Sequence, residues 1–252
     1  MFLSHMYRIF KSNLSKSIFL FILLIPTLEI IQIFLQTSSV PRPNFAFFLA
    51  GISRGHIFQI ILLWFLPLYF LLIISEDSIE DYKTGYSNIL ISKIGKKAYY
   101  KEKIMSSFLI SFITMFIALI INLLLVNLIF YRGTYYPQEG VILENNLLFT
   151  FSMKYPLITN FIFIIIASIL AGFSGVIGAS FSLFFKDKKY AYATTFFVWF
   201  VLVIKKNSLM YLFQPFAEYD VDVLLPILIA SILLFILISV SVYIYEVYFS
   251  EN

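Results

Sequence analysis

Residues 104–130 read IMSSFLISFITMFIALIINLLLVNLIF and contain no charged side chain. The stretch is longer than the roughly 20 apolar residues that a helix needs to cross the hydrocarbon core of a bilayer, which is about 30 Å thick. Hydrocarbon offers no partner for backbone N–H and C=O groups, so a stretch inside it must form a helix that satisfies its own backbone. The stretch therefore predicts a transmembrane α-helix.

Composition extends this prediction to the whole chain. Of the 252 residues, 61% are hydrophobic and 13% are charged, and the mean hydropathy is +0.92. A water-soluble domain would have too little polar surface to cover such a core. We therefore expect an all-α integral membrane protein in which residues 1–252 form one transmembrane domain. The six predicted spans are residues 18–35, 57–75, 104–130, 157–185, 190–204 and 223–248.

Positive charge predicts the orientation of the chain. Residues 1–16 place apolar side chains at helical spacing among three cations, which predicts an interfacial amphipathic helix lying on the membrane. If the N-terminus is inside, the inner side carries twelve Lys and Arg residues and the outer side carries six. Such an excess is typical of the cytoplasmic side. We expect a multi-pass protein of the plasma membrane with cytoplasmic N- and C-termini, in contact with the lipid bilayer and not with nucleic acid.

The loop between the second and third spans, residues 76–103, reads EDSIEDYKTGYSNILISKIGKKAYYKEK. It begins with four acids and contains six lysines, most of them near its end. Between Gly85 and Gly95, apolar residues at helical spacing predict one short amphipathic helix. Such a helix could present one face to a cytoplasmic partner. The simpler alternative is that the lysines only enforce topology and the acids balance them.

The spans, the N-terminal helix and this loop resemble the permease subunits of type-2 ATP-binding-cassette exporters, especially peptide-export and bacteriocin-immunity-like members. In that family this loop is the coupling helix that docks on the ATPase. The resemblance also implies a re-entrant extracellular element at residues 205–222. The chain departs from the family at Ser92, Lys93 and Ile94, where a proline-containing turn is often seen. The residues that the resemblance assigns to ATPase coupling are Glu76, Asp77, Glu80, Asp81, Tyr82, Gly85, Tyr86, Lys103, Lys186 and Asp187.

The resemblance implies partners and a cargo. The sequence lacks a G-x-x-x-x-G-K-[ST] phosphate loop, so ATP and Mg²⁺ would bind to two copies of a cytoplasmic ATPase subunit and this chain would hold no cofactor. A second permease, identical or similar, would complete the path. The cargo would be amphipathic or antimicrobial peptides or other hydrophobic compounds. The loop with Lys186 and Asp187 would be a second ATPase contact, or only a topology signal.

Two other functions stay open from the sequence. One is a non-transport membrane anchor or sensor that recruits a cytoplasmic partner through the same loop. The other is the substrate-binding membrane subunit of a vitamin importer, which is also small and multi-helical. The large charged loop argues against the importer.

Enzymatic chemistry has little support in this sequence. Cysteine is absent, and the two histidines, His5 and His56, are predicted to lie on opposite sides of the membrane. Neither H-E-x-x-H nor G-x-S-x-G occurs. A glutamate-type intramembrane protease would need paired glutamates within its helices, whereas the paired acids here lie in a loop. We predict no catalytic residue and no metal site.

A polar stripe lies within the first predicted span. Glu29, Gln32 and Gln36 share one helical face. A charge inside a membrane costs roughly 2.5 to 3.5 kcal/mol on insertion scales, so Glu29 should face protein or water. The stripe lines a translocation path, or it hydrogen-bonds to a neighbouring helix, for example through Asn122 or Asn127.

Small residues recur every four positions in the fourth predicted span, as at Ala171, Gly175 and Ala179. Small residues in register allow helices to approach closely, so tight packing is the first interpretation and a dimer seam is the second. In the second span, Pro67 predicts a kink.

Overall fold

The computed structural model describes residues 2–36, 40–135 and 146–250, including all side chains in these ranges except those of residues 2–4, 36 and 75–77. The expected all-α fold is confirmed for these residues, which contain no strand beyond one isolated bridge between Pro41 and Tyr135. The α-helices are α1 (Phe2–Lys11), α2 (Asn13–Gln36), α3 (Ile57–Gln59), α4 (Leu66–Phe70), α5 (Glu76–Lys83), α6 (Tyr86–Ile94), α7 (Lys96–Ile129), α8 (Leu147–Lys154), α9 (Pro156–Phe185), α10 (Lys188–Ile204) and α11 (Val221–Ile244). Short 3-10 turns (η1 Pro43–Phe45, η2 Phe48–Ala50, η3 Arg54–His56, η6 Leu209–Phe213) and π turns (η4 Ile60–Trp64, η5 Leu71–Ser75, η7 Tyr245–Phe249) complete the fold.

Several helices are long and apolar enough to cross a membrane. Within the described ranges there are four, namely α2, α7, α9 and α11 with η7, and a fifth if the bent pair 54–64 and 66–74 counts as one span. Helix α10 has 17 residues and so rises about 26 Å, slightly less than the hydrocarbon core. The structure thus has four or five candidate spans, and a membrane crossing by α10, which corresponds to the predicted span 190–204, stays a prediction.

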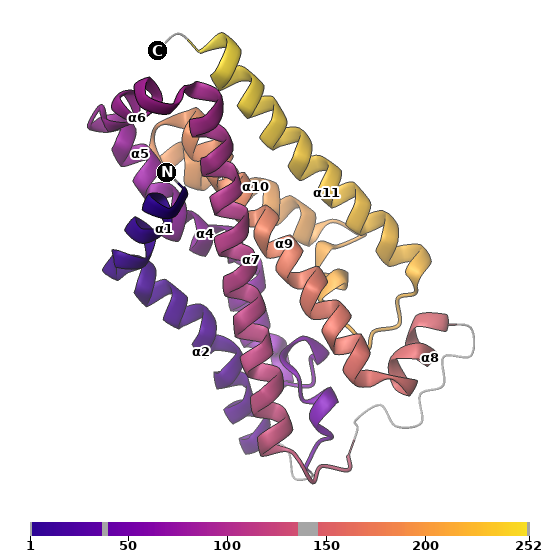
Figure 1. Cartoon of the computed structure of the whole chain (residues 1–252). Coiled ribbons are helices and arrows are strands. Elements are labelled where there is room, and N and C mark those ends of the chain that lie inside the picture. Colours follow the sequence, from indigo (N-terminus) through magenta and orange to yellow (C-terminus); the bar gives the residue numbers. More distant parts are fainter. Residues whose placement is uncertain (1, 37–39, 136–145, 251–252) are drawn as a thin grey trace.

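Both termini lie at one end of the bundle, next to α5 and α6 (Figure 1). Near the C-terminus, the Ser250 carbonyl accepts a hydrogen bond of 2.7 Å from the Lys96 ammonium at the start of α7. We call this the terminal end. At the opposite end the Asn160 side chain donates to the Asn44 carbonyl over 2.8 Å, and the rings of Phe45 and Phe216 are 4.7 Å apart.

Helix α9 is the central helix and packs against α4, α7, α10 and α11. Its small residues lie directly on these neighbours. A Cβ built on Gly175 would be 2.1 Å from the Ser111 hydroxyl of α7, and one on Gly172 would be 2.7 Å from the Phe108 ring. These small residues therefore serve helix packing within the chain, as the first interpretation of the pattern holds.

The second apolar segment is broken at Pro67. Its two halves bend by 41°, because proline has no N–H for the carbonyl four residues earlier and its ring crowds that turn. That carbonyl belongs to Leu63, and it accepts a hydrogen bond of 2.9 Å from the indole N–H of the fully buried Trp199 on α10. A side chain from another helix thus satisfies the backbone group that the proline leaves free.

Three features lie at the opposite end, of which the first two were not expected. Residues 43–53 form turns that bury Phe47, Phe48 and Leu49, and α8 is an additional short helix. Residues 205–220 fold onto the bundle around η6, with Leu209 and Phe213 buried. Whether this segment re-enters a membrane stays a prediction.

Helix α7 begins eight residues before the apolar run of 104–130. Its 34 residues span about 51 Å, well beyond a hydrocarbon core of about 30 Å. The first two turns, residues 96–103, therefore extend past the apolar part of the bundle at the terminal end, where they meet α1, α5 and α6.

Candidate functional site

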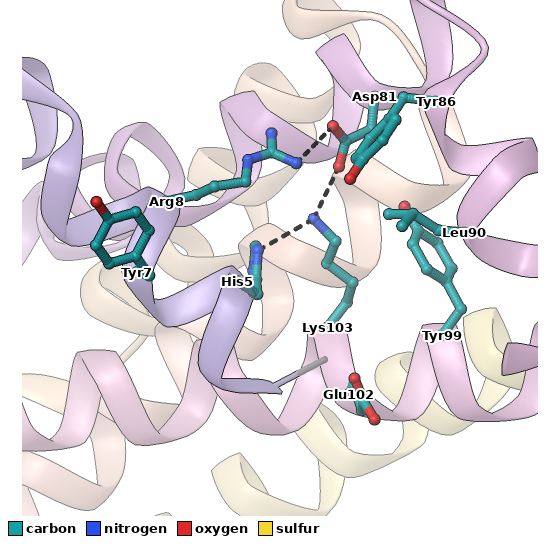
Figure 2. Close-up of a pocket in the computed structure, with 9 residues that line it drawn as sticks. All are labelled: His5, Tyr7, Arg8, Asp81, Tyr86, Leu90, Tyr99, Glu102 and Lys103. Carbon is teal, nitrogen blue, oxygen red and sulfur yellow. Dashed lines mark hydrogen bonds and ion pairs between the residues drawn. The ribbon is translucent and has the colours of Figure 1, made fainter. Parts of the chain in front are cut away.

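The candidate site lies at the terminal end, where α1, α5, α6 and the start of α7 meet (Figure 2). Two glycines make the sharp turns of this region. Gly85 has a φ of 73° between α5 and α6, and Gly95 has a φ of 82° between α6 and α7. Most side chains avoid such positive φ values, and glycine adopts them freely. The charged loop therefore folds as a compact helical hairpin, α5–α6, joined directly to α7.

Asp81 is the centre of a buried ion network. Its Oδ1 accepts from the Arg8 guanidinium of α1 at 2.9 Å, and its Oδ2 lies 3.2 Å from the Lys103 ammonium of α7. Asp81 is only 3% exposed. A buried charge that loses its partner costs about 3 to 5 kcal/mol, whereas an intact network defines one arrangement of the chain. Asp81 thus fixes the hairpin to both α1 and α7.

His5 completes this network. Its Nδ1 lies 3.5 Å from the Lys103 ammonium, and because an ammonium only donates, Nδ1 acts as the acceptor and the ring proton is on Nε2. Burial, followed by the charges of Lys103 and Arg8, lowers the pKa of His5 from 6.5 to about 3. The imidazole is therefore neutral at physiological pH.

A pocket of about 200 Å³ opens beside this network. The Tyr86 ring lies 5.7 Å from the Arg8 guanidinium carbon, and the Tyr99 ring lies 5.9 Å from the Lys103 ammonium. Glu102 adds a second carboxylate to the pocket lining. The described residues contain no group of three His, Asp or Glu side chains that could hold a metal ion. The contacts shown among the lining side chains are ion pairs, a hydrogen bond and cation–π contacts.

The outer face of the hairpin is available for contact. On α6, Ile89 and Lys93 are exposed, and Ile89 is 52% exposed. On α5, the Tyr82 ring is partly covered by the Lys186 ammonium, 4.5 Å away. The hairpin thus has a buried charged side and an exposed side that mixes apolar and basic residues.

Comparison with known proteins gives one relative. The chain is 53% identical over 250 residues to the uncharacterized protein YybM of Bacillus subtilis (strain 168), with 99% of each chain covered. This chain belongs to the YybM family. No protein-family model matches the chain, and no solved structure matches it. The YybM relationship therefore establishes kinship along the whole chain, and the site must be interpreted from its own geometry.

In this YybM-family chain, the residues assigned to coupling in the α5–α6 hairpin and at Lys103 fall into four groups. Asp81 and Lys103 are buried inside the ion network, while Glu80, Tyr82 and Tyr86 are exposed. Gly85 forms the turn. The side chains of Glu76 and Asp77 lie outside the described residues, although their backbone begins α5. The contacts of these residues with an ATPase stay predictions.

The loop between α9 and α10 adjoins the same region through the Lys186 contact with Tyr82. Asp187 caps α10, because its side chain accepts from the Lys189 backbone N–H at 2.9 Å. The two interpretations of this loop, a second contact or a topology signal, both stay open.

The polar stripe of α2 lies near the opposite end. Glu29 is 1% exposed and accepts a hydrogen bond from the Ser53 hydroxyl. Gln32 donates to the Arg54 carbonyl at 3.0 Å, and the side chain of Gln36 lies outside the described residues. In this conformation Glu29 and Gln32 hold the turns of residues 43–56 against α2, and their role in a translocation path stays a prediction.

Asn122 has a comparable structural role. Its side chain donates to the Pro26 carbonyl over 2.8 Å and accepts from the Phe48 backbone N–H over 3.0 Å. It thus joins α7, α2 and the turns at the opposite end, without contacting Glu29 by a hydrogen bond.

Sequence reasoning missed several partners at the terminal end. Arg8 and Asp81 are separated by 73 positions, and the hydroxyl of Tyr100 donates over 2.8 Å to the buried Glu246, 146 positions away. No periodic pattern links residues so far apart. The available signal was the presence of charged residues next to apolar spans, because charged residues at such positions are rarely left unpaired.

Proposed function

We propose that this protein is the permease subunit of an ATP-driven exporter of the type-2 ATP-binding-cassette class. The observation that supports this proposal best is the α5–α6 hairpin, whose outer face is exposed while its inner side is fixed by Asp81 to α1 and α7. A coupling element needs both properties. It must contact a partner, and it must transmit the partner's movement to membrane helices as a rigid piece.

The connection from the hairpin to the bundle is direct. Lys103 lies on the same helix, α7, as the long apolar run, so a shift of the hairpin acts on a candidate span without a flexible joint. Arg8 links the same carboxylate to α1, which leads into α2. Closure of two ATPase subunits would in this way shift the balance between two arrangements of the helices.

The packing within one chain favours a path formed by two permeases. Large side chains such as Trp199, Phe70 and Phe235 fill the interior and are fully buried. Grooves of about 490 and 480 Å³ instead lie between helices and are lined partly by exposed apolar residues. We therefore place the cargo path between this chain and a second permease, with amphipathic or antimicrobial peptides or other hydrophobic compounds as cargo.

The full proposal includes six spans in the plasma membrane with both termini in the cytoplasm. The segments α2, 54–74, α7, α9, α10 and α11 each connect the terminal end with the opposite end, which supports an even number of crossings (Figure 1). The excess of lysine and arginine at the terminal end supports its cytoplasmic location.

Purification of the tagged chain from native membranes tests the proposal. We expect an ATPase subunit to co-purify with the wild-type chain, and Ile89→Asp on the exposed face of α6 to abolish this. Leu147→Asp is the matched control, because it places the same charge on a highly exposed leucine at the opposite end. The amount of ATPase subunit and the rate of ATP hydrolysis are measured in each sample.

Each outcome has a clear meaning. Loss of the ATPase with Ile89→Asp but not with Leu147→Asp supports docking through α6. Retention of the ATPase by both variants would show that α6 is not the docking element. If the wild-type chain brings down no ATPase, the exporter proposal is wrong, and an anchor or sensor that recruits another cytoplasmic protein becomes the better explanation.

A further inference from the structure

A second cavity lies on the outer surface where α1, α2 and α7 meet. It is an open groove of about 430 Å³. One wall comes from α1 and α2, where the rings of Phe10 and Phe19 stack with centroids 5.6 Å apart. The other wall is the face of α7 that carries Ile110, Ile113 and Ile117. The groove runs along two candidate membrane spans, so its apolar walls face hydrocarbon.

The groove is apolar along its length and charged at one end. Among its lining residues, the polar ones are Lys16 and Thr114. The hydroxyl of Thr114 already donates to the Ile110 carbonyl at 2.7 Å. Within the described part of the chain, the ammonium of Lys16 has no hydrogen-bond or ion-pair partner. The groove therefore offers one uncompensated positive charge beside a hydrocarbon surface.

The position of Lys16 strengthens this charge. It lies in the first turn of α2, where the helix dipole adds positive potential. Lys11, at the end of α1, is close to Lys16 in the sequence and is also exposed. Its ammonium lies 5.9 Å from the centre of the Tyr7 ring. Clusters of basic residues at a membrane surface attract anionic lipid headgroups.

We propose that this groove binds one acyl chain of an anionic phospholipid, with the lipid phosphate at Lys16. The chemistry of this lipid matches that of the groove along its whole length, because an anionic phospholipid is apolar over its acyl chain and negative at its headgroup. A zwitterionic lipid would fill the same walls and gain less at Lys16. The proposal does not depend on the exporter function, because it concerns only the bilayer around this chain.

The test compares two lipids and four forms of the full chain in detergent. Binding of phosphatidylglycerol and of phosphatidylcholine with identical acyl chains is titrated by native mass spectrometry. The forms are wild type, Lys16→Gln, Lys101→Gln and Ile113→Trp. Lys101 is the matched control, because it is an exposed lysine at the same end and does not line the groove. Ile113→Trp fills the groove from an exposed position.

We expect wild type and Lys101→Gln to bind phosphatidylglycerol more tightly than phosphatidylcholine. A lysine near the membrane surface contributes enough attraction for about a fivefold change in affinity, so Lys16→Gln should lose about fivefold for phosphatidylglycerol and little for phosphatidylcholine. Ile113→Trp should lose both lipids. Glycerol phosphate, which has the headgroup charge without the chain, should not compete.

Three results would overturn the proposal. Equal binding of the two lipids by the wild-type chain would mark the groove as ordinary bilayer contact. An unchanged affinity in Lys16→Gln would remove the phosphate contact. If the mass spectrum instead showed a dimer of the chain without phospholipid, and Ile113→Trp abolished that dimer, a second copy of this chain would cover the groove.

Discussion

Gly175 illustrates how a single residue determines the distance between two helices. Its missing side chain leaves room for Ser111, whose hydroxyl would be 2.1 Å from an added Cβ, and for the Ser107 carbonyl, which would be 3.0 Å away. Gly178, one turn later, is less restricted, since its nearest neighbour would be the Leu71 side chain at 3.4 Å. Two glycines of the same helix thus differ in how much space they have.

This difference in space predicts that position 175 tolerates alanine less well than position 178. Gly175→Ala should lower the free energy of unfolding by about 1 to 3 kcal/mol, because α7 and α9 must separate to fit the methyl group. Gly178→Ala should change it by less than about 1 kcal/mol, since alanine also favours the helix. Denaturant unfolding of the purified chain in detergent measures both values. Equal losses in the two variants would contradict this packing.

At the scale of the elements, Asp220 connects two helices at the opposite end. It precedes α11 and accepts from the Val221 backbone N–H at 2.7 Å. The same carboxylate accepts from the backbone N–H groups of Leu147 and Leu148, at 3.1 and 3.2 Å, at the start of α8. One side chain therefore supplies acceptors to the free N–H groups of two helix starts.

The hydrogen bonds, chiefly that from Val221, lower the pKa of Asp220 below its ordinary value of 3.8. A carboxyl whose pKa is lower in the folded state stabilises the fold above the unfolded pKa, and this contribution is lost as the pH falls through the folded pKa. Asp220→Ala should cost about 0.5 to 2 kcal/mol near neutral pH, as the loss of a helix cap does. The cost should shrink below about pH 4.

Thermal unfolding of wild type and Asp220→Ala between pH 7 and pH 3 measures this prediction. Asp222→Ala is the control, because Asp222 is exposed in the first turn of α11 and does not receive these three hydrogen bonds. A difference between wild type and Asp220→Ala that stays constant down to pH 3 would argue against the carboxylate as the connecting group.

At the scale of the whole molecule, the number of crossings depends on α10. If α10 crosses the membrane, the loop before it and the turns after it lie on opposite sides. If it does not, both lie on one side. The chain contains no cysteine, so single cysteines can report each position without background.

We expect an impermeant thiol reagent to label Thr150→Cys and Asn207→Cys in intact cells. Ser92→Cys and Tyr190→Cys should react only after lysis. All four positions are exposed, and none of the substitutions changes a charge that helps to orient the chain. The same accessibility for Tyr190→Cys and Asn207→Cys would show that α10 does not cross, and the chain would then have an odd number of spans.

The sequence by itself determined the class of the fold and the approximate position of its long helices. Uninterrupted apolar runs must form helices in hydrocarbon, so the long apolar helices α2, α7, α9 and α11 follow from composition. The short helix α6 also followed from local signals, since Gly85 and Gly95 mark its two ends. Such features depend only on residues close together in the chain.

The tertiary structure alone decided which polar groups meet. Arg8 with Asp81, and Trp199 with the Leu63 carbonyl, join residues far apart in the sequence. These contacts depend on which helices are neighbours and on how each is rotated, and an apolar run that is hydrophobic on all sides does not encode its rotation. The buried turns of residues 43–53 were missed for the same reason, because only their position against α2 and α7 makes them part of the core.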